Sequence, residues 1–442
     1  MPCGSLMLPL SSRAKAHLRA KGDGDELIAP LTTPDILFDP WVTSSGPKLA
    51  AIAAEVAQAV LEAHSKEAGV RIRQPKAEVV ERTVTIVSSI IANLKLLHAN
   101  HRWGQYLALP MKHTALTRYD RPGFGIMPKV VEAMESAGLI MRHPPVTHVR
   151  RTGIEATGWL RASLMAKQVP VADIGRAEGE EVIRLSARAG RDHYGNRLPS
   201  VLVDYRDTEE TMKLRDEMDE INTFLATQHL EVNREPQAAY KLTRRFLLRS
   251  PLDSEAFNLH GRLYGGFWIS MPKVHRDSLT INEEPIADLD YGSMFPRLAY
   301  ARVSTVPPEG DLYAIPGLEQ HRAGVKAGLS ALLSTETEMT RLPPKVKEGL
   351  PAGWTASRFR DAVAKKHPAL VPLFGKDIAM DLMFTESCIL VAVLLRLARM
   401  GIAALPMHDG VMVQSRHGEA ARQVMLAVAA NRSGLDIPVV IK

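Results

Sequence analysis

The chain has 442 residues, a net charge of +6 at pH 7 and a pI of about 9.2. This length allows two or three domains, and a composition of 45% hydrophobic and 24% charged residues is ordinary for a soluble globular protein. Two cysteines exclude a disulfide framework or a cysteine zinc site. No apolar run is long enough for a membrane span and the N-terminus makes a poor signal peptide, so we expect no membrane partner and a cytoplasmic location. The basic balance favours a polyanionic partner.

The chain begins with a segment of low periodicity. Residues 1–45 are rich in Gly, Pro, Ser and Thr, which predicts an irregular N-terminal tail. Apolar residues at helical spacing then predict helices over Pro47–Glu67 and Ala77–Asn100. These helices open a mainly helical domain that we place at 46–235.

Within that domain, Pro128 opens a further helix, Gly138 closes it, and extended segments follow. A helix followed by an extended pair with basic residues between the strands resembles a winged helix, here at about 110–165. The same order is also common in scaffolds that make no contact with DNA, and both interpretations stay open.

A charged amphipathic helix is predicted over Thr208–Leu230, as a linker or as an arm packed on a neighbouring element. From about Tyr240 short apolar runs alternate with Gly and Pro, which is typical of strands and turns. We therefore place a second domain at 236–442.

Two aspartates stand at strand ends in this second domain. An apolar run in ADLDYGSMFPRLAYA (287–301) ends at Asp290, and Asp-Gly between two apolar runs in GIAALPMHDGVMVQS (401–415) predicts a hairpin with Asp409 at its tip. Taken alone, each is an ordinary strand end or turn. Together, two carboxylates on neighbouring strands match what a two-magnesium site for phosphoryl or nucleotidyl transfer requires.

The sequence around these aspartates, over about residues 258–415, resembles the polymerase region of family A DNA polymerases. The residues that match its template-primer strip are Gly261, Arg262, Leu263, Met271, Pro272 and Lys273. Its motif A is matched by Asp290, Tyr291 and Arg297, and the His-Asp of its motif C by His408 and Asp409. Between them, HRAGVKAGLSALLS (321–334) resembles the fingers helix, with Arg322 and Lys326 four residues apart on one helical face.

Three departures from that family stand out. Phe295 replaces the Glu of motif A, and DYGSMFP also resembles a family B motif in which an aromatic ring excludes the 2′-hydroxyl, so we expect Phe295 to act as a steric sugar gate. Gly410 replaces the Glu of motif C. Ser330 and Ser334 stand where the fingers helix has aromatic residues.

The resemblance implies an α+β fold: a right-hand polymerase palm with an antiparallel sheet and helical fingers, preceded by the mainly α domain. It implies a DNA-dependent DNA polymerase without a proofreading exonuclease, acting on primer-template DNA and dNTPs with two Mg²⁺ ions, for which Mn²⁺ can substitute. Metal binding would fall to Asp290 and Asp409, and Lys326 would also donate a proton to pyrophosphate. Nucleotide contacts would come from Arg322, Lys326, Phe295 and Tyr291, and nucleic-acid contacts from Arg262, Lys273, His408 and Arg297. Glu386, on the apolar helix before motif C, is a further candidate for supporting the site.

Two other interpretations stay open. A single-subunit RNA polymerase or a primase would share the palm and its His-Asp hairpin, and Phe295 is the residue that favours deoxynucleotides over this interpretation. A catalytically inactive DNA-binding replication factor would fit the missing aromatics of the fingers helix. The presence of both aspartates, with Arg322 and Lys326, favours an enzyme.

Overall fold

The computed structural model describes residues 35–67, 75–99, 105–111, 117–145, 151–166, 168–188, 190 and 198–442. They belong to two compact units. The first lies within residues 1–179, except for Thr117–Tyr119, which join Glu180–Lys442 in the second. Both units combine helices and strands, so the predicted α+β class is confirmed at that level. The structure groups residues 180–235 with the C-terminal part, whereas the sequence placed them in the preceding domain.

The first unit is built on two long helices, α2 (Pro47–Glu67) and α3 (Ala77–Ala99), which pack against each other where the sequence predicts them. Fully buried Ile86, Ile90 and Leu94 recur every four residues along α3 and form its core face. Two shorter helices complete the set, α4 (Met127–Ser136) and α5 (Gly158–Met165).

Two small sheets accompany these helices. One has the order β1-β3-β5-β4 and the other pairs β2 with β6. The strands are β1 (Ile36–Leu37), β2 (Val42–Ser44), β3 (Leu107–Leu109), β4 (Ile140–His143), β5 (Thr152–Ala156) and β6 (Ile174–Arg176). The predicted order of a helix followed by an extended pair is present as α4, β4 and β5. Of the basic residues between the two strands, His148 and Arg150 lie outside the described residues, and the exposed Arg151 directly precedes β5. Of the predicted tail, 1–34 also lies outside them, and 36–44 contributes two paired strands.

Two sheets organise the second unit. The larger has the order β10-β9-β13-β14-β16-β15, with β17 also paired to β14, and the smaller has the order β12-β11-β7-β8. The strands are β7 (Ile183–Ala187), β8 (Val201–Leu202), β9 (Leu230–Val232), β10 (Glu235–Pro236), β11 (Thr243–Leu248), β12 (His260–Tyr264), β13 (Leu279–Ile281), β14 (Glu284–Tyr291), β15 (Ala404–Met407), β16 (Gly410–Gln414) and β17 (Val439–Ile441). The larger sheet is antiparallel throughout. The parallel pairing of β7 with β11 is what ties residues 180–235 to this unit.

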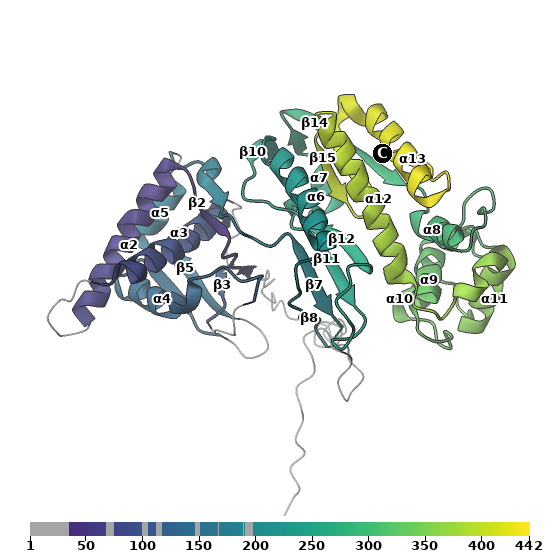
Figure 1. The fold of residues 1–442 in the computed structure, drawn as a ribbon, viewed down its shortest axis with the longest axis horizontal. Coiled ribbons are helices and arrows are strands. Elements are labelled where there is room, and N and C mark those ends of the chain that lie inside the picture. The colour runs from purple at the N-terminus through teal and green to yellow at the C-terminus, as the bar shows by residue number, and fades with distance from the viewer. Residues whose placement is uncertain are drawn as a thin grey trace, which may run out of the picture. The chain divides into compact units, whose positions relative to one another are not determined.

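The helices of this unit are α6 (Glu209–Ala226), α7 (Lys273–Arg276), α8 (Met294–Arg302), α9 (Arg322–Ser334), α10 (Pro344–Gly349), α11 (Ala356–Lys366), α12 (Ala379–Arg399) and α13 (Gly418–Ser433). Figure 1 shows α12 running from the sheet near β15 toward α9, where α8–α11 gather. The predicted linker or arm is α6, which packs along α12 inside this unit.

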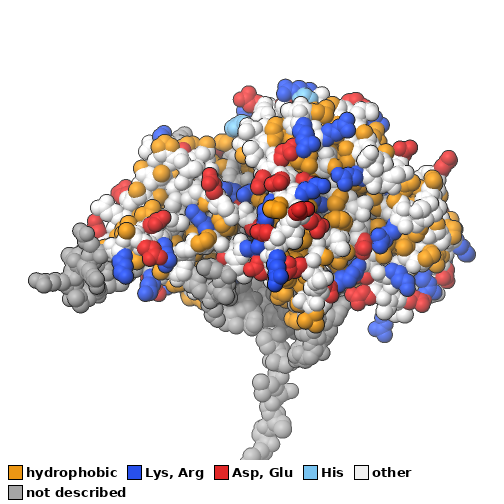
Figure 2. Space-filling view, viewed as in Figure 1, with side chains coloured by type: hydrophobic (Ala, Val, Ile, Leu, Met, Phe, Trp, Pro, Cys, Tyr) orange, Lys and Arg blue, Asp and Glu red, His pale blue; other side chains and the backbone are white. Residues whose placement is uncertain are grey.

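The surface does not concentrate the excess positive charge on the face drawn in Figure 2, where basic and acidic side chains of the described residues are interspersed. Net charge alone therefore does not locate a partner on this face. None of the helices in the described part of the chain is both long enough and apolar enough to cross a bilayer.

Candidate active site

The register between β14 and β16 brings Asp290 and Asp409 together. Asp290 lies opposite Gly410 in the antiparallel ladder, so Asp409, the residue before Gly410, lies beside it. The backbone N–H of Tyr291 donates to the carbonyl oxygen of Asp409 over 3.2 Å, which ties the two strand ends. The predicted hairpin with His408 and Asp409 at its tip is confirmed as the β15–β16 turn.

Two residues beside the aspartates hold a left-handed backbone without being glycine. His408 in the hairpin turn has φ 52°, and Ser293, which precedes α8, has φ 55°. Hairpin turns favour glycine or asparagine where φ is positive, because a larger side chain is strained there. His408 thus holds the hairpin turn in a backbone conformation that side chains other than Asn, Asp and His seldom adopt.

Gly410 occupies the position at which the family A motif C has Glu. A Cβ atom at Gly410 would overlap the carbonyl oxygen of Leu289 and lie 3.2 Å from Asp290 Oδ1. The close approach of β14 and β16 therefore excludes any side chain here. A third carboxylate reaches the neighbourhood from α12 instead, in Glu386, whose charge acts on Asp409.

Asp409 lies among negative charges. Burial raises its pKa, the charges of Asp290 and Glu386 raise it further, and the opposing effect of Lys326 leaves it at about 7. Carboxylates that repel one another are stabilised by a cation placed among them. The electrostatics thus favour binding of a cation at this pair.

Lys442, which follows β17, supplies one such cation. Its Nζ lies 2.7 Å from Asp290 Oδ2, and its backbone N–H donates to the carbonyl oxygen of Asp288. Partial burial lowers the pKa of Lys442, but the hydrogen bond to Asp290 and the charges of Asp288 and Asp409 outweigh burial and raise it overall. The β14–β17 pairing therefore delivers a lysine to the candidate metal ligand.

Arg262 on β12 pairs with Glu386 on α12. Its Nε lies 2.8 Å from Oε1 and its Nη2 lies 3.1 Å from Oε2, while only 2% of the glutamate side chain is exposed. Burial raises the pKa of Glu386, and Arg262 opposes that rise. This pair fixes the direction of Arg262 beside the aspartates.

The two predicted phosphate-binding cations lie one turn apart on α9, and both are exposed. The charge of Lys326 acts on Asp409, so the structure brings it to the aspartates. Arg322 is held by Asp311 through contacts of 2.6 and 3.2 Å, and its guanidinium lies 5.0 Å from the ring centroid of Tyr313. Tyr313 also feels the charge of Asp409, which places Arg322 at the edge of the same site.

Positive charge also surrounds the His408 imidazole. Partial desolvation lowers the pKa of His408, and the nearby Arg262 and Arg276 lower it further, so the ring is neutral at pH 7. Arg276 donates from Nη2 to the carbonyl oxygen of Met271, and among the described residues no partner lies within hydrogen-bond distance of its buried Nε. Arg262 and Arg276 thus form a cationic side of the site, next to the neutral His408.

Two predicted residues from motif A face elsewhere. Tyr291 is 4% exposed, and its hydroxyl donates to the carbonyl oxygen of Met425 over 2.8 Å, because adjacent strand residues point to opposite faces. Arg297 donates from Nε to the carbonyl oxygen of Gly292 and so braces its own turn. The structure does not bring either side chain to the carboxylates.

The remaining two predicted residues, Phe295 and Lys273, differ in exposure. Phe295 is half-buried on α8, four residues after the Asp290-Tyr291 strand end, and packs against the core. Lys273 is exposed at the start of α7. The predicted contacts of Phe295 with the nucleotide and of Lys273 with nucleic acid stay predictions.

The residues present fit a hard divalent cation. Asp290 and Asp409 offer oxygen ligands, which Mg²⁺ prefers, with few protein carboxylates and the other positions open to water and phosphate. Within the described residues no group of three or more His, Cys, Asp or Glu is arranged for a metal ion. A metal site here would therefore rest on these two carboxylates alone.

No family model matches the chain, and no curated protein matches it.

The structure adds Lys442, Asp311 and Tyr313 to the residues expected from the sequence. Nothing local in the sequence points to Lys442, because the strand pairing that places it joins segments about 150 residues apart. Asp311 and Tyr313 lie in a turn-rich segment eleven and nine residues before Arg322. Their short distance in sequence from Arg322 is the only sequence feature that points to Asp311 and Tyr313.

Proposed function

We propose that this chain is a template-directed nucleotidyltransferase, a DNA-dependent DNA polymerase without a proofreading exonuclease. The observation that carries the proposal is the β14–β16 register, which sets Asp290 beside Asp409. Burial, together with the charges of Asp290 and Glu386, raises the pKa of Asp409 to about 7. Two carboxylates on adjacent rigid strands are the minimum that two-metal phosphoryl transfer requires of a protein.

Asp290 and Asp409 would hold two Mg²⁺ ions in this enzyme. When bound, such ions lower the pKa of a primer 3′-hydroxyl and neutralise the leaving pyrophosphate. Lys442 would leave Asp290 when a divalent ion binds, since both compete for the same carboxylate.

The cations of α9 would bind the triphosphate of an incoming dNTP. Lys326 is already close enough to act on Asp409, and its flexible ammonium can both offset phosphate charge and hand a proton to the leaving group. Arg322 would exchange the carboxylate of Asp311 for phosphate oxygens, which a guanidinium binds with the same two-point geometry.

The cationic side of the site would bind the nucleic-acid backbone and primer end. Arg262, Arg276 and the neutral His408 lie together there, and Lys273 is exposed on the same α7 helix as Arg276. Each backbone contact made by such a cation adds affinity that weakens with salt.

Primer extension with each nucleotide class tests this proposal against its alternatives. The wild-type chain, a labelled primer on a DNA template and Mg²⁺ are incubated with dNTPs or with NTPs. Extension with dNTPs supports a DNA polymerase, and preferential extension with NTPs would replace it by an RNA polymerase or primase. DNA binding without extension by either class would favour an inactive replication factor.

A further inference from the structure

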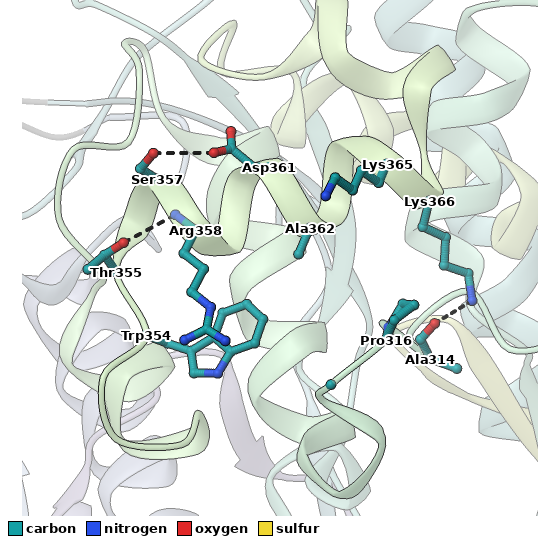
Figure 3. Close-up of a pocket in the computed structure, with 11 residues that line it drawn as sticks. Ala314, Pro316, Trp354, Thr355, Ser357, Arg358, Asp361, Ala362, Lys365 and Lys366 are labelled. Atoms are coloured by element: carbon teal, nitrogen blue, oxygen red, sulfur yellow. Dashed lines mark hydrogen bonds between the residues drawn. The ribbon is translucent and has the colours of Figure 1, made fainter.

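The second unit has a pocket of about 820 Å³ that the polymerase account does not use. Helix α11 forms one side and residues 314–317 form the other, as Figure 3 shows. A volume of about 300–1,000 Å³ is typical of pockets for small organic ligands. The space is therefore large enough for a nucleotide.

An aromatic ring paired with a cation lines one end of this pocket. The guanidinium of Arg358 lies over the indole of Trp354, 4.4 Å from the ring centroid. The backbone of Arg358 is anchored, because its N–H donates to Thr355 Oγ1 over 3.2 Å. Trp354 is half-buried and packs against the core, which holds the indole in place. Flat rings stack on such a surface, whether indole or guanidinium.

The charge of the pocket is positive. Arg358, Lys365 and Lys366 line it against a single acid, Asp361, which bonds to Ser357. In Figure 3 Arg358 and Lys365 border the open space from two sides. The pocket therefore offers a stacking surface together with cations for an anionic group.

Hydrogen bonds hold in place the wall of the pocket that residues 314–317 form. Lys366 Nζ donates to the carbonyl oxygens of Asp311 and Ala314 over 2.7 and 2.6 Å. The adjacent His367 is fully buried, donates from Nε2 to Leu312 and accepts from the Tyr300 hydroxyl. The ammonium of Lys366 is thus hydrogen-bonded to the wall of the pocket, which leaves Arg358 and Lys365 as the cations available to a ligand.

We infer that this pocket binds one nucleotide unit, with its base stacked on the layer that Arg358 and Trp354 form and its phosphate held by Lys365. The unit is part of an unpaired nucleic-acid strand or a free nucleotide, since both present the same base and phosphate. The same segment, 311–317, carries Asp311, which holds Arg322 on its other side. As a site for an unpaired template strand the inference rests on the proposed polymerase function, whereas nucleotide binding itself does not.

Fluorescence anisotropy of a labelled oligothymidylate of about 12 nucleotides tests the inference, because single-strand sites span about 4–16 nucleotides. The full chain is used with EDTA present, so that no catalysis is needed. Trp354→Ala and the double variant Arg358→Ala/Lys365→Ala are compared with Lys347→Ala, an exposed lysine of α10 outside the pocket.

Both pocket variants are expected to bind the oligonucleotide about tenfold more weakly than the wild type, since one stacked base contributes about that much. Lys347→Ala is expected to bind as the wild type does. Wild-type affinity in both pocket variants would overturn the inference, as would a wild type that binds neither the oligonucleotide nor thymidine monophosphate. Because Arg358 and Lys365 are exposed, the double variant keeps the test valid should Trp354→Ala fail to fold.

Competition by thymidine monophosphate separates the two sources. Displacement of the oligonucleotide at about 1 mM competitor, an affinity range open to a small ligand, assigns a free nucleotide, and no displacement assigns a strand. Primer extension by the same preparations separates this inference from the proposed function. Pocket-dependent binding without any extension would refute the polymerase alone, and extension with pocket-independent binding would refute the pocket alone.

Discussion

The guanidinium of Arg262 and the carboxylate of Glu386 meet at two points, Nε to Oε1 at 2.8 Å and Nη2 to Oε2 at 3.1 Å. The pair joins β12 of the smaller sheet to α12, whose far end leads into the β15–β16 hairpin. A buried carboxylate without such a partner would carry the full cost of leaving water. The same contact thus supports the fold and orients a cation of the candidate site.

Removing one member of this pair should destabilise the protein more than removing both. Arg262→Met leaves Glu386 buried without its partner and is expected to lower the free energy of unfolding by about 3 kcal/mol. Arg262→Met/Glu386→Leu is expected to recover most of that loss. Urea unfolding at neutral pH measures both, and a double variant no more stable than the single one would contradict the account.

Gly410→Ala should be destabilising because the strands leave no room for a methyl group. The new Cβ would overlap the carbonyl oxygen of Leu289, so we expect a loss of about 1–3 kcal/mol in thermal or urea unfolding. Gly418→Ala is the control, since its Cβ would lie 3.5 Å from the Cβ of Ala287, an ordinary contact. Equal stability of the two variants would show that β14 and β16 are farther apart than described.

Lys442→Met should strengthen divalent-metal binding. Without Lys442, a metal ion can bind Asp290 without first displacing an ammonium group. A partly exposed ion pair contributes up to about 1 kcal/mol, so we expect metal affinity to rise by up to about fivefold. Calorimetric titration with Mg²⁺ or Mn²⁺ measures this directly, without catalysis. Lys442→Arg should bind metal as the wild type does, and weaker binding by Lys442→Met would exclude competition.

His367 should make stability depend on pH on the acid side. Burial lowers the pKa of His367 in the folded state. Below the unfolded value of about 6.5, His367 is therefore protonated in the unfolded chain while it stays neutral in the folded chain. The contribution to stability is therefore present above the unfolded pKa of about 6.5 and is lost progressively as the pH falls below it. The free energy of unfolding, measured with urea above and below that pH, should depend less steeply on pH in His367→Gln than in the wild type. An identical pH dependence in the two proteins would contradict the assignment to His367.

Local sequence patterns were enough to predict much of the framework. Pro47–Glu67 coincides with α2, and His321–Ser334 differs from α9 only by its first residue. The Asp-Gly signal located the β15–β16 hairpin. These features depend on spacings of two to four residues, which are readable without knowledge of the fold.

The pairing of strands that are far apart in the sequence could not be predicted from local patterns. The parallel pairing of β7 with β11 moves residues 180–235 into the second unit, and the β14–β17 pairing brings Lys442 to Asp290. The orientation of Tyr291 was readable, because strand alternation directs it away from the face that carries Asp290. Local periodicity gives no information on which distant strand lies beside another.

Primer extension by aspartate variants tests the central claim most directly. Wild type, Asp290→Asn and Asp409→Asn are compared on one primer-template with dNTPs and Mg²⁺, with Asp288→Asn as the control on the same strand and face. We predict that extension by the wild type falls by more than about 100-fold in each of the first two variants and persists in the third. Extension that survives loss of either Asp290 or Asp409 would contradict a site built on these two carboxylates.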